Sequence, residues 1–392
     1  MKITQLSLIV AALITTQVYA EDTLQEIVVT TTNKTPQSIN ETTSDITVIT
    51  SEDIQEHGYQ TVAEAISHVP GITMTSNGGL GQPVSLFVRG EDAGKVLVLL
   101  DGMRLNDPST PDGRATLAHL TTDNIERIEI VKGGMSSIWG GNASAGVINI
   151  ITKGAKKGLH THVQVGYGSH HTKKASLHAA YDNGALSGVL NASRLKTDGF
   201  SALLPRDAEA DGYTNTSYNL KLGYRFDPHN RFGLYYNQID YDVEYDSAFP
   251  APNPDDALSK STGKQKNYKA DYNFQYDDYS MNLSASKGDF HREYSYGTFD
   301  VAIKEYTMLN SLKYTDGKVI AGLDYKDIDD GSDGAFVNKA VYLSNLYHIN
   351  DSTLLESNLR YDDFDKFDNK TTYKIGLKHQ HDFLKGFTTS AN

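Results

Sequence analysis

Carboxylate side chains occur close together at two places in the second half of the sequence. Asp207, Glu209 and Asp211 alternate along one stretch, and Asp240 and Asp246 follow the next expected hairpin. Ca²⁺ takes about six to eight oxygen ligands, and carboxylates from neighbouring loops supply them when they converge. These five residues are therefore a candidate calcium site. Ordinary solvated surface charge explains the same pattern, and the sequence leaves both interpretations open.

Composition and motif content exclude most catalytic classes. The 392 residues include no cysteine, which excludes disulfides, thiolate metal sites and cysteine nucleophiles. The glycines at 133–134 and 140–141 are not followed by the Gly-Lys-Ser/Thr of a phosphate-binding loop. The chain has no His-Glu-x-x-His motif and no nucleophile elbow, and its 13 histidines show no ligand spacing. We predict that it is not an enzyme and has no covalently bound cofactor. Its net charge of −13 argues against nucleic acid, because phosphates are bound by clustered Lys and Arg.

The N-terminus has the features of an export signal. Lys2 supplies the positive end, and Leu6–Ile14 is an apolar run too short to span a bilayer. Val18-Tyr19-Ala20 resembles a signal-peptidase site, so residues 1–20 are predicted to be a signal peptide cleaved after Ala20. A buried N-terminal helix is the alternative. No later apolar stretch approaches the roughly 18 residues that a membrane helix needs.

Two structural regions follow the signal and a polar segment. Residues 21–45 are polar around one β-prone island and predict a flexible segment. Residues 46–155 contain short strands, a helical turn that Ser51 caps and a second helix that Thr61 and Glu64 cap. Val96–Leu100 is continuously apolar, as expected of a strand covered on both faces, and Asp101-Gly102 predicts a hairpin turn after it. This region is predicted to be an α+β domain with its own core.

Residues 156–392 have a different pattern. Segments of about ten residues recur between polar turns, and apolar and polar residues alternate within them. In one such segment Tyr218, Leu222 and Tyr224 share one face, and Asn219 and Arg225 the other. A transmembrane barrel strand with an apolar outside and a polar inside has this alternation, although a soluble β-sandwich strand also alternates. We predict roughly twelve to fourteen antiparallel strands, with tyrosines in interfacial girdles. Because a barrel in lipid has no free edge, they are expected to be part of a larger barrel and the chain a fragment.

Three sequence stretches of the first domain resemble a known family. Ile125–Gly133, the turn Ser136–Gly140 and Gly146–Thr152 resemble the end of the plug domain of TonB-dependent outer-membrane receptors. The resemblance implies a mainly β protein of the Gram-negative outer membrane: an α+β plug domain followed by a partial transmembrane antiparallel β-barrel. It also implies a complete barrel of about 22 strands.

An N-terminal segment fits the same family. Glu26, Ile27, Val28, Val29 and Thr30 resemble its TonB box. The implied partner is the TonB energy transducer with its inner-membrane complex. Physically, a flexible strand with free backbone groups can add to the edge of a partner's sheet. An idle N-terminal strand is the alternative.

Two plug loops are the candidate ligand site. The stretches Asn77–Gln82, Phe87–Gly90 and Val96–Asn106 resemble the plug of cobalamin (vitamin B12) receptors in this family. In those receptors the loops corresponding to residues 76–82 and 106–114 approach the extracellular ligand. The residues carried over are Ser76, Asn77, Gly78, Gly79, Leu80, Gly81, Gln82, Asn106, Asp107 and Arg114. Receptors for siderophores or haem share much of this sequence.

The resemblance bears on the charged residues as well. Cobalamin receptors carry calcium on their early extracellular loops, but this chain has Ser201 where they have an aspartate after a Gly-aromatic pair. Arg89, Glu126 and Glu129 occur in apolar strands, where an unpaired charge is costly. We expect them to form ion pairs within the plug or towards the barrel wall.

The expected function is active uptake of a scarce chelate, with cobalamin first and a ferric siderophore or haem as the alternative. A non-transporting barrel adhesin and a passive porin are further alternatives. The expected partners are the transducer, the chelate and outer-membrane lipid.

Overall fold

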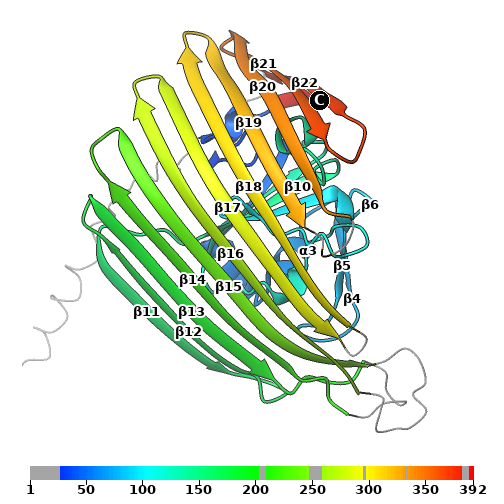
Figure 1. Ribbon diagram of the computed structural model, residues 1–392. Coiled ribbons are helices and arrows are strands. Elements are labelled where there is room, and N and C mark those ends of the chain that lie inside the picture. The colour runs from blue at the N-terminus through cyan, green and yellow to red at the C-terminus, as the bar shows by residue number, and fades with distance from the viewer. Residues whose placement is uncertain are drawn as a thin grey trace, which may run out of the picture.

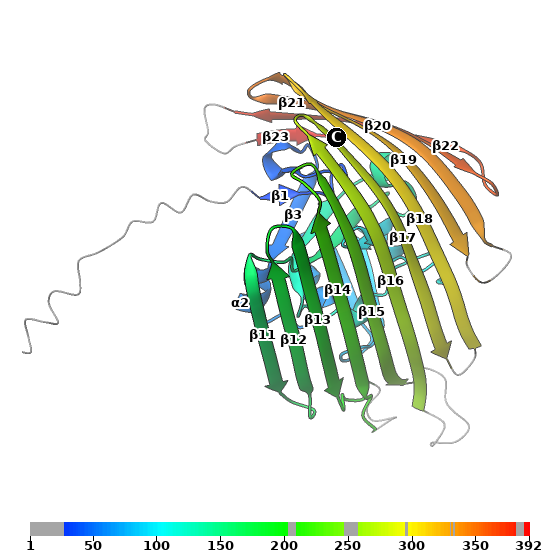
Figure 2. The same cartoon turned by 60° about the vertical axis from the view of Figure 1, so that its left-hand side comes forward.

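The computed structural model describes residues 27–202, 209–246, 258–294, 297–329, 331, 334–381 and 388–392. It contains a small α+β domain partly enclosed by one large curved sheet (Figures 1 and 2). The predicted fold class is confirmed: the chain is mainly β, with a plug domain and a partial antiparallel barrel. The predicted signal peptide lies outside the described residues. No helix among the described residues is long and apolar enough to cross a membrane.

The plug domain is built on a five-stranded sheet with the order β3-β9-β10-β7-β8. Its strands are β3 Asp45–Thr50, β7 Val96–Leu100, β8 Met103–Arg104, β9 Ile125–Lys132 and β10 Gly146–Thr152. Only β7 and β10 pair in parallel. The predicted turn after β7 is confirmed, because Asp101 and Gly102 join β7 to β8 with positive φ angles of 49° and 80°. A three-stranded sheet of β4 Ile72–Ser76, β5 Val84–Val88 and β6 Glu91–Asp92 lies beside it.

Short helices cover the plug sheet. They are α2 Ser51–His57, α3 Val62–Ser67 and α4 Ser136–Trp139, with 3₁₀ turns η2 Ile39–Glu41, η3 Ala93–Lys95 and η4 Leu117–His119. The first helix is capped one residue before the predicted position. Thr50 Oγ1 accepts from Asp53 N at 3.2 Å while the Asp53 carboxylate accepts from Thr50 N at 2.8 Å, which is a complete capping box.

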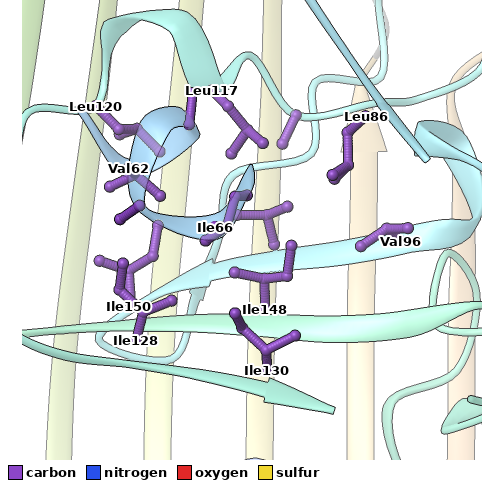
Figure 3. Close-up of a cluster of buried hydrophobic side chains, with 14 of the residues drawn as sticks. Val62, Ile66, Leu86, Val96, Leu117, Leu120, Ile128, Ile130, Ile148 and Ile150 are labelled. Carbon is purple, nitrogen blue, oxygen red and sulfur yellow. The ribbon is translucent and has the colours of Figure 1, made fainter. Parts of the chain in front are cut away.

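Both faces of the plug sheet are buried. On one face α3 packs against the three central strands, and Figure 3 shows Val62 and Ile66 above Ile128, Ile148 and Ile150. On the other face Leu97, Leu99, Val131, Val147 and Ile138 form a second cluster. Every residue of β7 is buried, so the prediction of a strand covered on both faces is confirmed.

The large sheet has 13 strands that pair in sequence order, each antiparallel to the next. They are β11 Gly158–Tyr167, β12 Lys173–Asp182, β13 Leu186–Thr197, β14 Tyr213–Arg225, β15 Asn230–Asp246, β16 Leu258–Tyr276, β17 Tyr279–Tyr294, β18 Gly297–Tyr314, β19 Gly317–Asp329, β20 Phe336–Asn350, β21 Thr353–Phe364, β22 Lys370–Gln380 and β23 Thr388–Ala391. Among the described residues β11 and β23 are its two edges and do not pair with each other.

The predicted alternation of faces is present in this sheet. On β14 the outward Tyr218 is 43% exposed, whereas the next residue, Asn219, is 1% exposed and faces the plug side. The inner face is polar and the outer face apolar, as in transmembrane barrels. A further 2-stranded sheet, β1 Val28–Val29 with β2 Gln37–Ser38, lies between the plug and the barrel wall.

Candidate ligand and transducer sites

The two ends of the large sheet differ in the length of their connections. At one end, turns of two residues join β16 to β17 and β18 to β19. At the other end, residues 198–212 separate β13 from β14 and residues 247–257 separate β15 from β16. We refer to these as the short-turn end, uppermost in Figure 2, and the long-loop end.

The first predicted ligand loop, residues 76–82, lies at the long-loop end. Gln82 Nε2 donates to the Glu244 carbonyl at 2.6 Å, and Gly79 lies against the Phe200 ring. Gly81 has φ +83° and contacts the ring of Tyr213, and a Cβ at this position would overlap that ring. The loop is therefore fixed to β14 and β15 at its C-terminal end. Ser76 and Asn77 remain exposed at the other.

Two residues of the second predicted ligand loop are buried instead of facing a ligand. The Asn106 amide accepts from Val98 N at 2.8 Å and donates to the Val96 and Gly113 carbonyls. Asp107 accepts from Ser109 N at 2.9 Å and pairs with Arg292 Nε at 3.1 Å. They are 3% and 2% exposed, so both side chains make contacts within the protein, and a ligand role for these residues stays a prediction.

The remaining predicted ligand residue, Arg114, is placed differently. Its side chain is half-buried and pairs with Asp112 at 2.7 Å within the same loop. The part of the second loop that stays accessible is thus the stretch from Pro108 to Arg114. Small and polar residues dominate it, which suits hydrogen bonding more than apolar contact.

The candidate calcium residues do not meet in the described structure. Asp207 lies outside the described residues. Asp246 accepts from Ser201 Oγ at 3.2 Å and from Ala202 N at 2.9 Å, while Asp240 pairs with Lys264 at 3.5 Å. Glu209 is exposed and Asp211 is buried. Within the described ranges no three His, Asp or Glu side chains are arranged to hold a metal ion, so calcium binding stays a prediction.

The predicted transducer segment is folded, not free. Glu26 lies outside the described residues, and Ile27 and Val28 are exposed. Val28–Val29 pairs with Gln37–Ser38, and Val29 is fully buried. Thr30 N donates to Glu129 Oε2 at 2.9 Å. The segment after Thr30 therefore differs from the flexible segment predicted for residues 21–45.

Glu129 explains why this segment folds. Its side chain is fully buried, and a buried carboxylate needs donors. Thr31 N donates to it at 3.0 Å and Arg127 pairs with it at 2.9 Å, in addition to Thr30 N. Of the three charged residues singled out in the sequence, only Glu129 is buried in this way.

The other two predicted ion-pair residues lie nearer the surface. Arg89 pairs with Asp45 at 2.7 Å, and both side chains are about half exposed. Glu126 accepts from Gly154 N at 3.0 Å and lies 4.0 Å from Arg127. Both contacts are within the plug.

The sequence did not identify the charged residues that attach the N-terminal segment to the barrel wall. Lys34 Nζ pairs with Asp324 Oδ2 at 2.9 Å, and Arg360 Nη1 donates to the same oxygen at 2.7 Å. Burial lowers the pKa of Lys34, and the Asp324 carboxylate opposes this shift. Arg360 also donates to the Ile138 carbonyl in α4 at 3.1 Å. The available signal for Asp324 and Arg360 was that both charges occupy inward-facing positions of alternating strands.

An aromatic stack attaches the plug to the wall nearer the long-loop end. The His119 ring lies 3.5 Å from that of Tyr241 and 5.7 Å from that of Tyr213, measured between ring centroids. Tyr213 Oη lies 3.1 Å from His119 Nδ1, and Asn215 Nδ2 donates to the His119 carbonyl. Burial lowers the pKa of His119 to about 3. The imidazole is therefore neutral at physiological pH.

Comparison with known proteins supplies the family context. Residues 38–147 match the family model "TonB-dependent Receptor Plug Domain". Over 396 aligned residues the chain is 28% identical to the "Vitamin B12 transporter BtuB" of Vibrio cholerae serotype O1. That alignment includes 94% of this chain but only 62% of the relative, so the chain spans less than two thirds of the curated relatives it matches.

Solved structures share the fold. The siderophore receptor PirA from Acinetobacter baumannii superposes with a TM-score of 0.73 at 16% identity, over 86% of this chain and 59% of that one. A ferric enterobactin receptor of Pseudomonas aeruginosa crystallised with enterobactin gives 0.71 at 17% identity, over 86% and 60%. At these identities the likeness concerns the fold alone.

Proposed function

We propose that this chain, which belongs to the TonB-dependent receptors, binds a scarce chelate outside the cell and takes part in its active uptake. Its location is the outer membrane of a Gram-negative bacterium, where its relatives form β-barrels. The long-loop end is then extracellular and the short-turn end periplasmic. The candidate ligand loop 76–82 faces outside, and the N-terminal segment lies on the periplasmic side, where a transducer could reach it.

Cobalamin is the ligand we propose first. The observation that carries this choice is the 28% identity to a vitamin B12 transporter over 94% of the chain. The loop Ser76–Gln82 agrees with it, because it contains no charged residue. Cobalamin is large, close to neutral and rich in peripheral amides, so small polar loops suit it. A strongly anionic ferric siderophore usually calls for clustered Arg or Lys.

A ferric siderophore or haem is the second candidate. Arg114 lies half-buried in the accessible part of the second loop, and a guanidinium there suits an anionic ligand. The barrel loops could add further positive charge.

Energy would be supplied at the segment Glu26–Thr30. Val28–Val29 forms a short strand on which the Val28 side chain is exposed, and a transducer strand could pair with it or replace its present partner β2. Uptake is then tied to the contacts that Thr30 and Thr31 make with Glu129.

Uptake of labelled cyanocobalamin tests this proposal. Cells that lack their own cobalamin receptor and produce this protein from its whole gene should accumulate the label when TonB is present. Deleting TonB should abolish accumulation and leave surface binding intact. Accumulation that is equal with and without TonB would contradict active uptake and favour a passive pore.

A further inference from the structure

A cavity of about 530 Å³ lies between the plug and the wall of the barrel. Its plug side includes Arg104 on β8 and Trp139 on α4, and its wall side includes residues of β14 to β19 and Arg360 on β21. Strands β16 to β19, which form much of that wall, lie in the middle of the 13-stranded sheet, away from both of its edges. Much of the cavity wall is therefore formed by strands that pair with a neighbour on both sides.

The charges of three side chains in this cavity do not cancel one another. Arg104 Nε donates to Glu305 Oε1 at 3.1 Å, and Lys326 Nζ lies 3.9 Å from the same oxygen. Arg104 and Lys326 are only 7% and 9% exposed. One carboxylate thus faces two buried cations, and no other Asp or Glu of the described residues lies within ion-pair distance of Lys326. An uncompensated buried charge is costly.

The surrounding charges are balanced among themselves, which makes this excess local. Lys34 and Arg360 pair with Asp324, and Arg360 also pairs with Asp362. Further along the cavity Lys221 pairs with Asp101 and Lys269 with Asp271. No neighbouring carboxylate is left over for the Arg104–Lys326 pair in the part of the chain that the structure describes.

Arg104 also carries an unsatisfied donor. Arg104 Nη1 is buried and has no hydrogen-bond partner among the described residues. A guanidinium with a free N–H is pre-set for the oxygens of a carboxylate or phosphate. Ser286, the cross-strand neighbour of Glu305, also lines the cavity and carries a hydroxyl donor.

We propose that this cavity binds one oxyanion, a carboxylate or phosphate group, between Arg104 Nη1 and Lys326 Nζ. The bound group supplies the negative charge that Glu305 alone does not. A free anion such as phosphate and an anionic part of a chelate in transit both carry such a group, and the experiment below distinguishes these two sources. The site follows from the charges and the cavity and does not depend on the proposed uptake.

The chain contains a built-in reporter for this site. Trp139 is its single tryptophan and lines the cavity. Its fluorescence in the purified detergent-solubilised protein should change as inorganic phosphate is titrated, and the change should saturate. Isothermal titration gives an independent affinity, and a parallel titration with cyanocobalamin, which carries a phosphodiester, is read by calorimetry alone.

Substitutions at Lys326 make the test specific. Lys326→Gln leaves Arg104 and Glu305 as a neutral pair, so phosphate affinity should fall about tenfold or more, whereas Lys326→Arg keeps the charge and should stay within about threefold. Lys304→Gln is the matched control, because Lys304 lies on the neighbouring strand, exposed and paired with Asp327, and this variant should bind like the original. Circular dichroism establishes that each variant is folded.

Saturable phosphate binding that Lys326→Gln weakens supports a site for a free anion. Binding of cyanocobalamin but not phosphate, with the same loss in Lys326→Gln, supports a site for the chelate's own anionic group. The proposal is overturned if neither probe binds, or if folded Lys326→Gln binds as tightly as the original protein.

Discussion

At the scale of single residues, the sequence shows which side chains can form hydrogen bonds but not which partners they bind. Asn106 was assigned a ligand role from the resemblance to cobalamin receptors, yet all its hydrogen bonds join β7 to its own loop. Asp107 is likewise held by Arg292, 185 positions later in the sequence. A partner at that separation leaves no local signal. Gly81, in contrast, belongs to a glycine-rich loop that the sequence did single out, and the structure gives a steric reason for it.

Gly81→Ala should displace the ligand loop. Its φ of +83° and its contact with the Tyr213 ring both disfavour a Cβ, so binding of labelled ligand to whole cells should fall about tenfold or more. Gly90→Ala is the control, because Gly90 has the same φ but no atom near its missing Cβ. Equal effects of the two substitutions would mean that backbone strain, and not the loop's contact with Tyr213, matters for binding.

His119 predicts a pH dependence of stability. Burial lowers its pKa from 6.5 to about 3, so the unfolded chain binds a proton that the folded one does not between these values. The contribution of neutral His119 to the free energy of unfolding is fully present above pH 6.5. It is lost as the pH falls, by roughly 3 kcal/mol at pH 4. Thermal unfolding between pH 7 and pH 4 should show this loss. His119→Phe keeps a ring between Tyr213 and Tyr241 and should flatten the pH dependence, and an unchanged slope would refute the assignment.

At the scale of elements, hydrophobic periodicity predicted the strands, because local residue patterns determine them. The strand expected at Ile125–Gly133 is β9, and the alternation around Tyr218 is that of β14. The N-terminal segment was predicted wrongly from Thr30 onward, because its order comes from Glu129 and Asp324, which are far away in the sequence. Sequence composition measures the tendency of a segment to fold alone and does not include such distant partners. The same limit applies to every plug–barrel contact described above.

Val28→Pro tests the transducer segment. Proline removes a backbone donor from a strand that is expected to pair with the transducer. Uptake should be abolished, while binding of ligand at the cell surface persists. Val28→Ala keeps the donor and should transport normally. If Val28→Pro reduced binding and uptake together, the segment would be needed for the receptor's structure, and its assignment as the TonB box would be wrong.

At the scale of the whole molecule, the plug is attached to the wall at both ends. Near the long-loop end, the His119 stack and the Asp107–Arg292 pair hold it. Towards the short-turn end, Lys34 and Arg360 meet at Asp324. Displacing the whole plug from the wall would break these contacts. The predicted calcium would act at the long-loop end.

Calcium binding is tested on the purified whole protein. If Asp207, Glu209, Asp211, Asp240 and Asp246 gather around Ca²⁺, calorimetry should detect binding at or below about 1 mM Ca²⁺, and Mg²⁺ should substitute poorly because it requires a tighter octahedral site. Chelation should then weaken ligand binding. Absence of heat at millimolar Ca²⁺ would leave these residues as solvated surface charge.

Ligand competition tests the central claim most directly. Labelled cyanocobalamin is bound to cells producing the protein from its whole gene, and unlabelled cyanocobalamin, ferric siderophores and haem are added in turn. We expect a Kd below about 1 μM for cyanocobalamin, with displacement by unlabelled cyanocobalamin and none by the iron chelates. Displacement by a ferric siderophore or haem, or no cyanocobalamin binding at all, would contradict the account and assign the protein to iron acquisition.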